Sequence, residues 1–348
     1  MPISTRSKVI LIVLVLAGAV LRFWNIGFQR MNWDEEWTIK FAGTGITAAQ
    51  LFIKSLSTDC NPPLYYLAAH FSMLVFGETA TAIRIPSAVA GVLLIPVMYF
   101  IGREYKDELF GLLLAGFSTL FYNFIFYSKY GRSYSLALLF FSITFYYFMR
   151  LLKGDKKFSI PFGIFALLSL YAHLYTTIPL GIMILYLLYE QKVYLKGILI
   201  TIIGSVLLLN YFTLIGTART LSNGNFGETP LAVLLYTPLD LFTYSVFIIF
   251  PIILWSCWKY RDDKLIRIIT IISLTTWFSM IVLAIRTPMI LHYALFLVPG
   301  LLLAFTMPFY LAIKQREVYF HHYLVIMVIV ILEVVQTVAL FTIQRGSW

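Results

Sequence analysis

Long apolar runs separated by short polar breaks dominate the chain from end to end. A helix needs about 20 apolar residues to cross the hydrocarbon core of a bilayer, and most of the runs approach that length. The runs lie near residues 9–24, 85–101, 109–127, 134–151, 158–174, 177–190, 195–215, 237–257, 265–285, 289–312 and 322–343. This pattern predicts an all-α protein, a polytopic transmembrane bundle of about eleven spans.

Composition agrees with a membrane protein and excludes an ordinary soluble domain. The chain is 60% hydrophobic and 12% charged, with a mean hydropathy of +0.86. A soluble domain is roughly half apolar and about a quarter charged. The longest hydrophilic stretch is too short to fold by itself. We therefore expect residues 1–348 to form a single transmembrane domain without a separate soluble domain.

The chain has a net charge of +10. We interpret this charge as a signal of membrane topology and not of nucleic-acid binding, so nucleic acid is not an expected partner. The orientation depends on residues 62–77, an apolar run of only 16 residues that starts with two prolines. If this run stays on one face, 16 of the 26 Lys and Arg residues share the opposite side, which the positive-inside rule makes cytoplasmic. They are Arg6, Lys8, Arg103, Lys106, Arg150, Lys153, Lys156, Lys157, Lys192, Lys196, Lys259, Arg261, Lys264, Arg267, Lys314 and Arg316. Residues 25–84 then form the first outer loop, and 62–77 is an outer-face or re-entrant juxtamembrane helix.

That outer loop carries three consecutive acids in NWDEEW, residues 32–37, just past the first span. Ionisable groups at the membrane surface are costly to desolvate, so we interpret Asp34 and Glu35 as candidate catalytic acids. The alternative is an acidic helix start that complements the helix dipole, which suits Glu35 and Glu36 well.

A second outer loop has the sequence YSKYGRSY, residues 127–134. Lys129 and Arg132 are three residues apart and can share one face of a helical turn. Two cations beside tyrosine hydroxyls would make a phosphate clamp. The alternative is ordinary anchoring of a span at the membrane interface.

The remaining outer residues complete the candidate site. Arg286 and His292 bracket the last outer turn and together could bind an anion. Other polar groups of these loops are expected to line the substrate cavity: Asn61, Tyr65, Tyr66, Tyr134 and His173. A single histidine such as His173 is also a common packing residue.

Several sites are missing from the sequence. There is no GxxxxGKS or GxxxxGKT for ATP, no HExxH, no cysteine pair with zinc spacing and no GxSxG. We expect no cofactor and no metal site, although a divalent metal ion remains open.

Acids and cations on the same outer face support one reaction. The acid can take a proton from an acceptor hydroxyl, while the cations hold a leaving phosphate. A phosphate presented on that face is a polyprenyl phosphate, since nucleotide sugars are cytoplasmic. One base and a phosphate leaving group favour inversion through an oxocarbenium-like transition state. We therefore predict a hexosyl or pentosyl transferase, which moves the sugar of a polyprenyl-phosphate donor in the bilayer to the hydroxyl of an undefined acceptor. A secondary transporter and a lipid-linked glycan ligase or polymerase are the alternatives.

The order of motifs adds a resemblance. After the first span come the acids, then NPPLYYL, then FGETATAIRIPSAVAGVLLIPVMYFIGREY, then YSKYGRSYSL. Over residues 8–150 the chain resembles the protein O-mannosyltransferase-like branch of the C-type glycosyltransferases, which includes bacterial lipid A aminoarabinose transferases. The resemblance implies that Asp34 activates the acceptor with Glu35 beside it. It also implies that Arg132 lies in the site and that Arg286 or His292 holds the lipid phosphate, in a prokaryotic plasma membrane with the site facing outward.

The chain departs from the family pattern at two positions. Members usually carry an acid two residues before the arginine of the second loop, where this chain has Tyr130. Many members have Arg-Tyr where this chain has His292 and Tyr293. The departures leave no second acid at the second loop and change the group expected at the donor phosphate.

Overall fold

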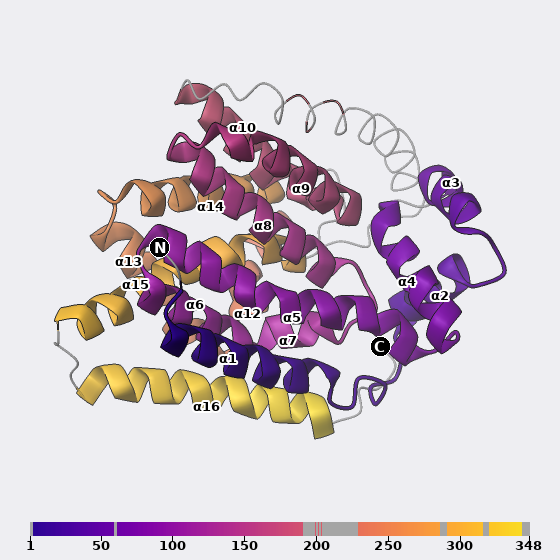
Figure 1. The fold of residues 1–348 in the computed structure, drawn as a ribbon, viewed down its shortest axis with the longest axis horizontal. Coiled ribbons are helices and arrows are strands. Elements are labelled where there is room, and N and C mark those ends of the chain that lie inside the picture. Colours follow the sequence, from indigo (N-terminus) through magenta and orange to yellow (C-terminus); the bar gives the residue numbers. More distant parts are fainter. Residues whose placement is uncertain are drawn as a thin grey trace.

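The computed structural model describes residues 3–58, 61–190, 229–285, 291–315 and 320–342, together with residues 199, 201 and 203. Over these residues every regular element is a helix, which confirms the predicted fold class. Figure 1 shows long helices packed side by side, with three short helices gathered at one end of the bundle.

Four described helical stretches are long and apolar enough to cross a bilayer, and two bent helix pairs would bring the total to six. The four are α5 (Ala80–Tyr105), α8 (Tyr134–Leu152), α14 (Lys264–Leu283) and the stretch His292–Gln315, which contains α15 (Val298–Gln315). The expected eleven spans are therefore not confirmed. Other predicted runs correspond to α1 (Thr5–Phe23), α9 (Ser159–Ala172), α10 (Thr177–Tyr189) and α16 (Phe320–Thr342). The run at 195–215 lies outside the described residues, apart from three positions.

Two runs expected to be continuous helices are broken instead. Residues 109–127 form α6 (Glu108–Leu120) and α7 (Tyr122–Ser128), which meet at 58° because Phe121 adopts an extended conformation. Residues 237–257 fall in α12 (Pro230–Phe242) and α13 (Val246–Lys259), which meet at 104°. The second break contains Thr243, a non-glycine residue with φ of +48°.

The first outer loop folds into three short helices, α2 (Trp33–Ala42), α3 (Ala48–Thr58) and α4 (Pro63–Phe76). The α4 helix has 14 residues, fewer than a span needs. Its Tyr65 and Ser72 hydroxyls donate to the adjacent carbonyls of Ile83 and Ala82, each over 2.6 Å. Tyr65 and Ser72 are seven positions apart on α4, yet they bond to adjacent residues of α5. The α4 helix therefore crosses the start of α5 and does not run alongside it.

Close packing between α5 and α6 depends on glycine. A Cβ on Gly111 would lie 2.6 Å from the carbonyl oxygen of Tyr99, and one on Gly102 would lie 2.9 Å from the Cα of Gly111. Small residues of this kind let membrane helices approach backbone to backbone.

The basic loops gather at the opposite end of the bundle from α2 and α4. Ion pairs join them to one another: Lys106 to Asp263, Arg150 to Glu104, Lys264 to Glu190 and Lys314 to Asp107, at 2.8–3.0 Å. At about 1.5 Å per residue, the 26 residues of α5 separate the two ends by about 39 Å.

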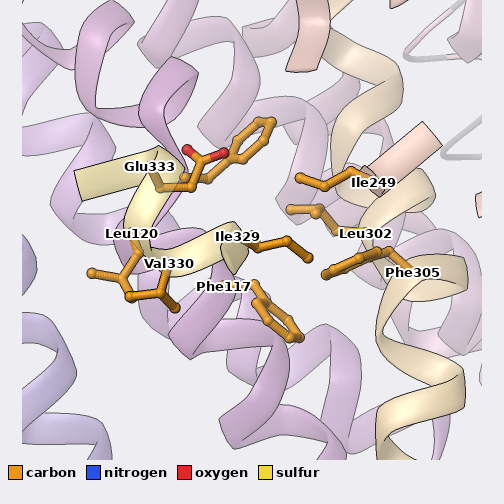
Figure 2. Close-up of a pocket in the computed structure, with 9 residues that line it drawn as sticks. Phe117, Leu120, Ile249, Leu302, Phe305, Ile329, Val330 and Glu333 are labelled. Carbon is orange, nitrogen blue, oxygen red and sulfur yellow. The ribbon is translucent and has the colours of Figure 1, made fainter. Parts of the chain in front are cut away.

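An apolar pocket lies inside the bundle, where α6 meets α13, α15 and α16. Figure 2 shows its lining residues, of which Glu333 is the one carrying an ionisable group. The lining residues are Phe117, Leu120, Phe121, Ile249, Leu302, Phe305, Ile329, Val330 and Glu333.

Candidate active site

The acidic motif forms the first turn of α2. Asn32 caps this helix, because its side-chain oxygen accepts the N–H of Glu35 over 3.0 Å. The Glu35 carboxylate in turn accepts the N–H of Asn32 over 3.4 Å, which completes a capping box. The helix-start interpretation therefore holds for Glu35, and the cap fixes where Asp34 lies one residue earlier.

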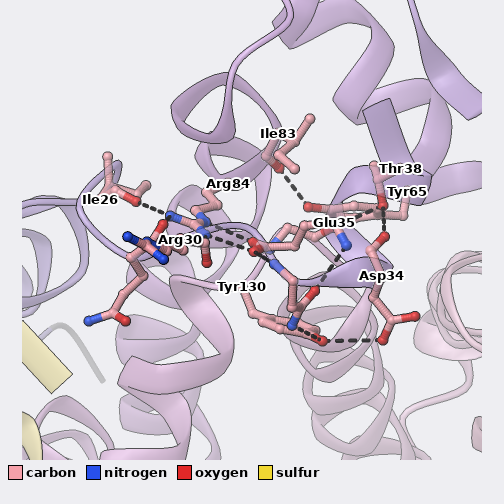
Figure 3. Close-up of polar contacts among 12 residues, drawn as sticks. Ile26, Arg30, Asp34, Glu35, Thr38, Tyr65, Ile83, Arg84 and Tyr130 are labelled. Carbon is pink, nitrogen blue, oxygen red and sulfur yellow. Dashed lines mark hydrogen bonds and ion pairs between the residues drawn. The ribbon is translucent and has the colours of Figure 1, made fainter. Parts of the chain in front are cut away.

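Glu35 is buried in an ion pair with Arg84 (Figure 3). The guanidinium donates from Nε and from one terminal nitrogen, each over 2.7 Å, to the two carboxylate oxygens. The N–H of Gly131 donates to the same carboxylate over 2.7 Å. Arg84 also donates to the carbonyls of Ile26 and Gln29, each over 2.9 Å. One buried pair thus joins α2, α5, the loop after α1 and the turn after α7.

Asp34 is the accessible acid of the motif, with 41% of its side chain exposed. The Tyr130 hydroxyl donates to one carboxylate oxygen over 3.2 Å, and a guanidinium nitrogen of Arg132 lies 3.7 Å from the other. Burial, together with the charge of Asp34, raises the pKa of the Tyr130 phenol. Tyr130 therefore remains a hydrogen-bond donor at neutral pH, and Asp34 is left open to an incoming hydroxyl.

Arg132 connects Asp34 to the aromatic part of the site. Its side chain is only 12% exposed, and it donates to the Tyr66 hydroxyl over 3.4 Å. Its backbone carbonyl accepts from the Ser87 hydroxyl over 2.9 Å, which holds the turn against α5. The guanidinium also interacts with the Tyr134 hydroxyl.

Two histidines lie on the far side of Tyr134. The Nε2 atom of His292 is 2.9 Å from the Tyr134 hydroxyl, and the His173 ring centroid is 5.4 Å from that of Tyr134. The His173 ring also packs on Tyr293, with centroids 5.1 Å apart. The two histidines thus meet at one aromatic cluster, next to the arginine that contacts Asp34.

The structure brings most of the predicted site residues together: Asp34, Glu35, Tyr66, Arg132, Tyr134, His173 and His292. Tyr65 is buried and bonded to α5, and Asn61 is half-buried at the start of α4. Lys129 donates to the backbone carbonyl of Trp24, at the end of α1, and burial lowers its pKa to about 8. Arg286 lies outside the described residues.

Sequence reasoning missed the roles of Arg84 and Tyr130. Arg84 lies in the first turns of an apolar helix, where a charge requires a partner, and this was the signal that could have found it. Tyr130 was noted only for the acid it replaces, yet its hydroxyl contacts Asp34. Among the described residues, no three His, Cys, Asp or Glu side chains gather as metal ligands would.

Comparison with known proteins identifies the architecture. Residues 60–215 match the family model described as dolichyl-phosphate-mannose-protein mannosyltransferase. The crystal structure of ArnT from Cupriavidus metallidurans in the apo state superimposes with a TM-score of 0.64 at 13% identity. The chain therefore shares its fold with ArnT. The predicted resemblance is confirmed, and the protein is a multi-pass integral membrane protein.

A second ArnT structure, bound to undecaprenyl phosphate, gives a TM-score of 0.60 at 12% identity. Both matches cover 87% of this chain and 60% of the ArnT chain. Among the curated proteins, no significant sequence match is found. Since identity is low and 40% of ArnT has no counterpart in the match, the comparison establishes the fold, while the reaction is argued from the site.

Proposed function

We propose that the protein transfers a hexosyl or pentosyl residue from a polyprenyl phosphate to an acceptor hydroxyl, with inversion. The observation that carries the proposal is the pairing of an accessible carboxylate, Asp34, with a largely buried guanidinium, Arg132, 3.7 Å away. A base and an anion-binding group side by side suit a reaction that removes a proton from one reactant and stabilises negative charge on the other.

Asp34 is the general base in this scheme. Its carboxylate, which is 41% exposed, takes the proton of the acceptor hydroxyl as the acceptor oxygen forms a bond to the anomeric carbon. The bond from that carbon to the phosphate oxygen breaks, and its electron pair leaves with the polyprenyl phosphate. Glu35 cannot serve, because both its oxygens are occupied by Arg84, Gly131 and Asn32 in a buried position. It positions Asp34 instead.

Arg132 is the donor-phosphate ligand that the geometry favours. The phosphate develops charge as the glycosidic bond breaks, and a guanidinium can bind two of its oxygens. His292 acts beside it through Tyr134, and Arg286 remains a further candidate. ArnT is similar in fold and binds undecaprenyl phosphate, which supports a polyprenyl-linked donor. Lys129 donates to the carbonyl of Trp24, so we assign it a structural role.

The distribution of charge supports an outward-facing site. The basic loops are held together by ion pairs at one end of the bundle, and the Asp34 site lies at the other. Under the positive-inside rule the basic end is cytoplasmic. The site then opens on the outer face of a prokaryotic plasma membrane, where polyprenyl-phosphate sugars serve envelope glycosylation.

The test is release of polyprenyl phosphate by purified protein in sealed proteoliposomes. Undecaprenyl phosphates carrying labelled hexoses or pentoses are supplied with a panel of acceptors: lipid A, a peptide rich in Ser and Thr, and an oligosaccharide. We expect at least one pair to give labelled product, with Glu36→Gln active and Asp34→Asn inactive. Movement of intact donor across the bilayer without cleavage would favour a transporter and contradict the proposal.

A further inference from the structure

The break between α6 and α7 leaves backbone groups without their helical partners. In a continuous helix the N–H of Tyr122 would donate to the carbonyl of Ser118, and the N–H of Asn123 to that of Thr119. The 58° bend at Phe121 separates these groups. Inside a bilayer there is little water to replace them, so other protein groups must do so.

Arg22 supplies the missing donors for α6. It lies on α1, is fully buried, and donates to the Ser118 carbonyl over 3.1 Å and to the Thr119 carbonyl over 3.3 Å. A third bond, over 3.2 Å, ties it to Gly18 of its own helix. The cation also lies at the negative end of the α6 dipole.

Glu333 supplies the missing acceptor for α7. Its carboxylate accepts the N–H of Tyr122 over 2.5 Å and the hydroxyl of Ser245 over 2.5 Å. The residue before the helix, Phe121, has no side-chain oxygen to cap it. Glu333 is 4% exposed, on the wall of the apolar pocket in Figure 2.

We propose that Arg22 and Glu333 are positioning residues for the active site. Each takes one half of the Tyr122–Ser118 hydrogen bond that the break opens, and together they fix the direction in which α7 leaves α6. The α7 helix has only seven residues and ends at Ser128, so its direction determines where Tyr130 and Arg132 meet Asp34. The Asn123 amide supports the same end of α7 by donating to the carbonyls of Asp240 and Leu241 over 2.6 and 2.7 Å.

The first test compares two substitutions of one side chain. In Glu333→Gln the amide oxygen can still accept from Tyr122, whereas in Glu333→Leu nothing can. Deuterium uptake by peptides covering residues 117–128 should rise in Glu333→Leu and stay near wild type in Glu333→Gln. The matched control is Val335→Ala, on the exposed face of the same helix. Equal uptake in the Leu and Gln variants would overturn the proposal.

The second test separates positioning from stability. Arg22→Met leaves the Ser118 carbonyl without its donor, and Glu333→Leu leaves the Tyr122 N–H without its acceptor, so both should lower the unfolding temperature. In the double variant the two backbone groups left open are helical partners of each other and can bond again, so its unfolding temperature should recover. Turnover should nevertheless stay at least about ten-fold below wild type, because α7 is redirected. Recovery of both stability and turnover in the double variant would overturn the proposal.

The turnover measurement rests on the proposed function, whereas the exchange measurement does not. If no donor is turned over by the wild-type protein, the proposed function fails and deuterium uptake alone decides the role of the two residues. If transfer is observed and uptake is unchanged in Glu333→Leu, the positioning role fails and the proposed function stands.

Discussion

The Arg84 guanidinium and the Glu35 carboxylate share two hydrogen bonds of 2.7 Å within the first outer loop. Both side chains are 2% exposed. The carboxylate also bonds to Gly131, so the pair holds the turn that carries Arg132 against the helix that carries Asp34. Asp34 and Arg132, the two groups proposed to act on the substrates, are therefore adjacent because the buried pair of Glu35 and Arg84 holds their segments together.

Replacing one partner of this pair should destabilise the protein strongly. Glu35→Gln leaves a buried guanidinium without a counter-charge, a change that typically costs about 3–5 kcal/mol. Thermal unfolding in detergent should show a much lower midpoint for Glu35→Gln than for Glu36→Gln, whose side chain is exposed. A wild-type midpoint for Glu35→Gln would show that the pair does not hold the site together.

Arg132 should be needed for donor affinity. A hydrogen bond to a charged group contributes about 1.5–3 kcal/mol, or roughly 10- to 150-fold in binding. Arg132→Met should weaken the binding of a non-transferable polyprenyl-phosphate analogue by that factor, while Lys129→Met should change it little. The reverse ranking would assign the phosphate to Lys129.

Lys129 should make stability depend on pH in alkaline solution. Burial lowers its pKa in the folded protein to about 8, from the ordinary lysine value of 10.5. Between these values the unfolded chain binds a proton that the folded chain does not, so this residue's contribution to stability rises as pH increases from about 8 to 10.5. Below pH 8 the contribution is constant.

The measurement is the unfolding midpoint of the wild type minus that of Lys129→Met across this range. The difference should become more favourable to the wild type with increasing pH. A flat difference would mean that the Lys129 amine is not desolvated at the end of α1.

The two ends of the bundle should face opposite sides of the membrane. Gly45→Cys lies in the first outer loop, with open space around its position, and Lys157→Cys lies in a basic loop. In intact cells, with Cys60 and Cys257 replaced by Ser in both variants, a membrane-impermeant maleimide should label only the first. Labelling of both from the same side would contradict the topology.

The sequence predicted those parts of the protein in which the pattern repeats over a whole helix. The apolar runs located α5, α8 and α14, and the short run 62–77 corresponds to the 14 residues of α4. The break at Phe121 could not be predicted, since no glycine or proline marks it and its partners, Arg22 and Glu333, lie far away in the chain.

The sequence predicted which residues belong to the candidate site better than it predicted how those residues are arranged. The sequence named Asp34 and Arg132, but only the family resemblance placed Asp34 ahead of Glu35. What distinguishes Glu35 from Asp34 is contact with Arg84, 49 residues later, and that pairing depends on how the loop folds back on α5. Burial of Lys129 against α1 is likewise a tertiary property that local spacing does not encode.

Asp34→Asn should abolish transfer and leave donor binding largely intact. The amide keeps the size of the side chain and can still accept from Tyr130, but it cannot take a proton from the acceptor. Loss of a general base typically lowers the rate by about 10²–10⁴-fold. Single-turnover transfer and binding of a donor analogue should be measured separately for Asp34→Asn, with Glu36→Gln as the matched control. Since Asp34 is 41% exposed, its replacement should also leave the unfolding midpoint near wild type, unlike that of Glu35→Gln. A near-normal transfer rate in Asp34→Asn would exclude Asp34 as the base. It would also contradict the proposed mechanism, because in the described structure no other carboxylate of the motif is both accessible and in contact with Arg132.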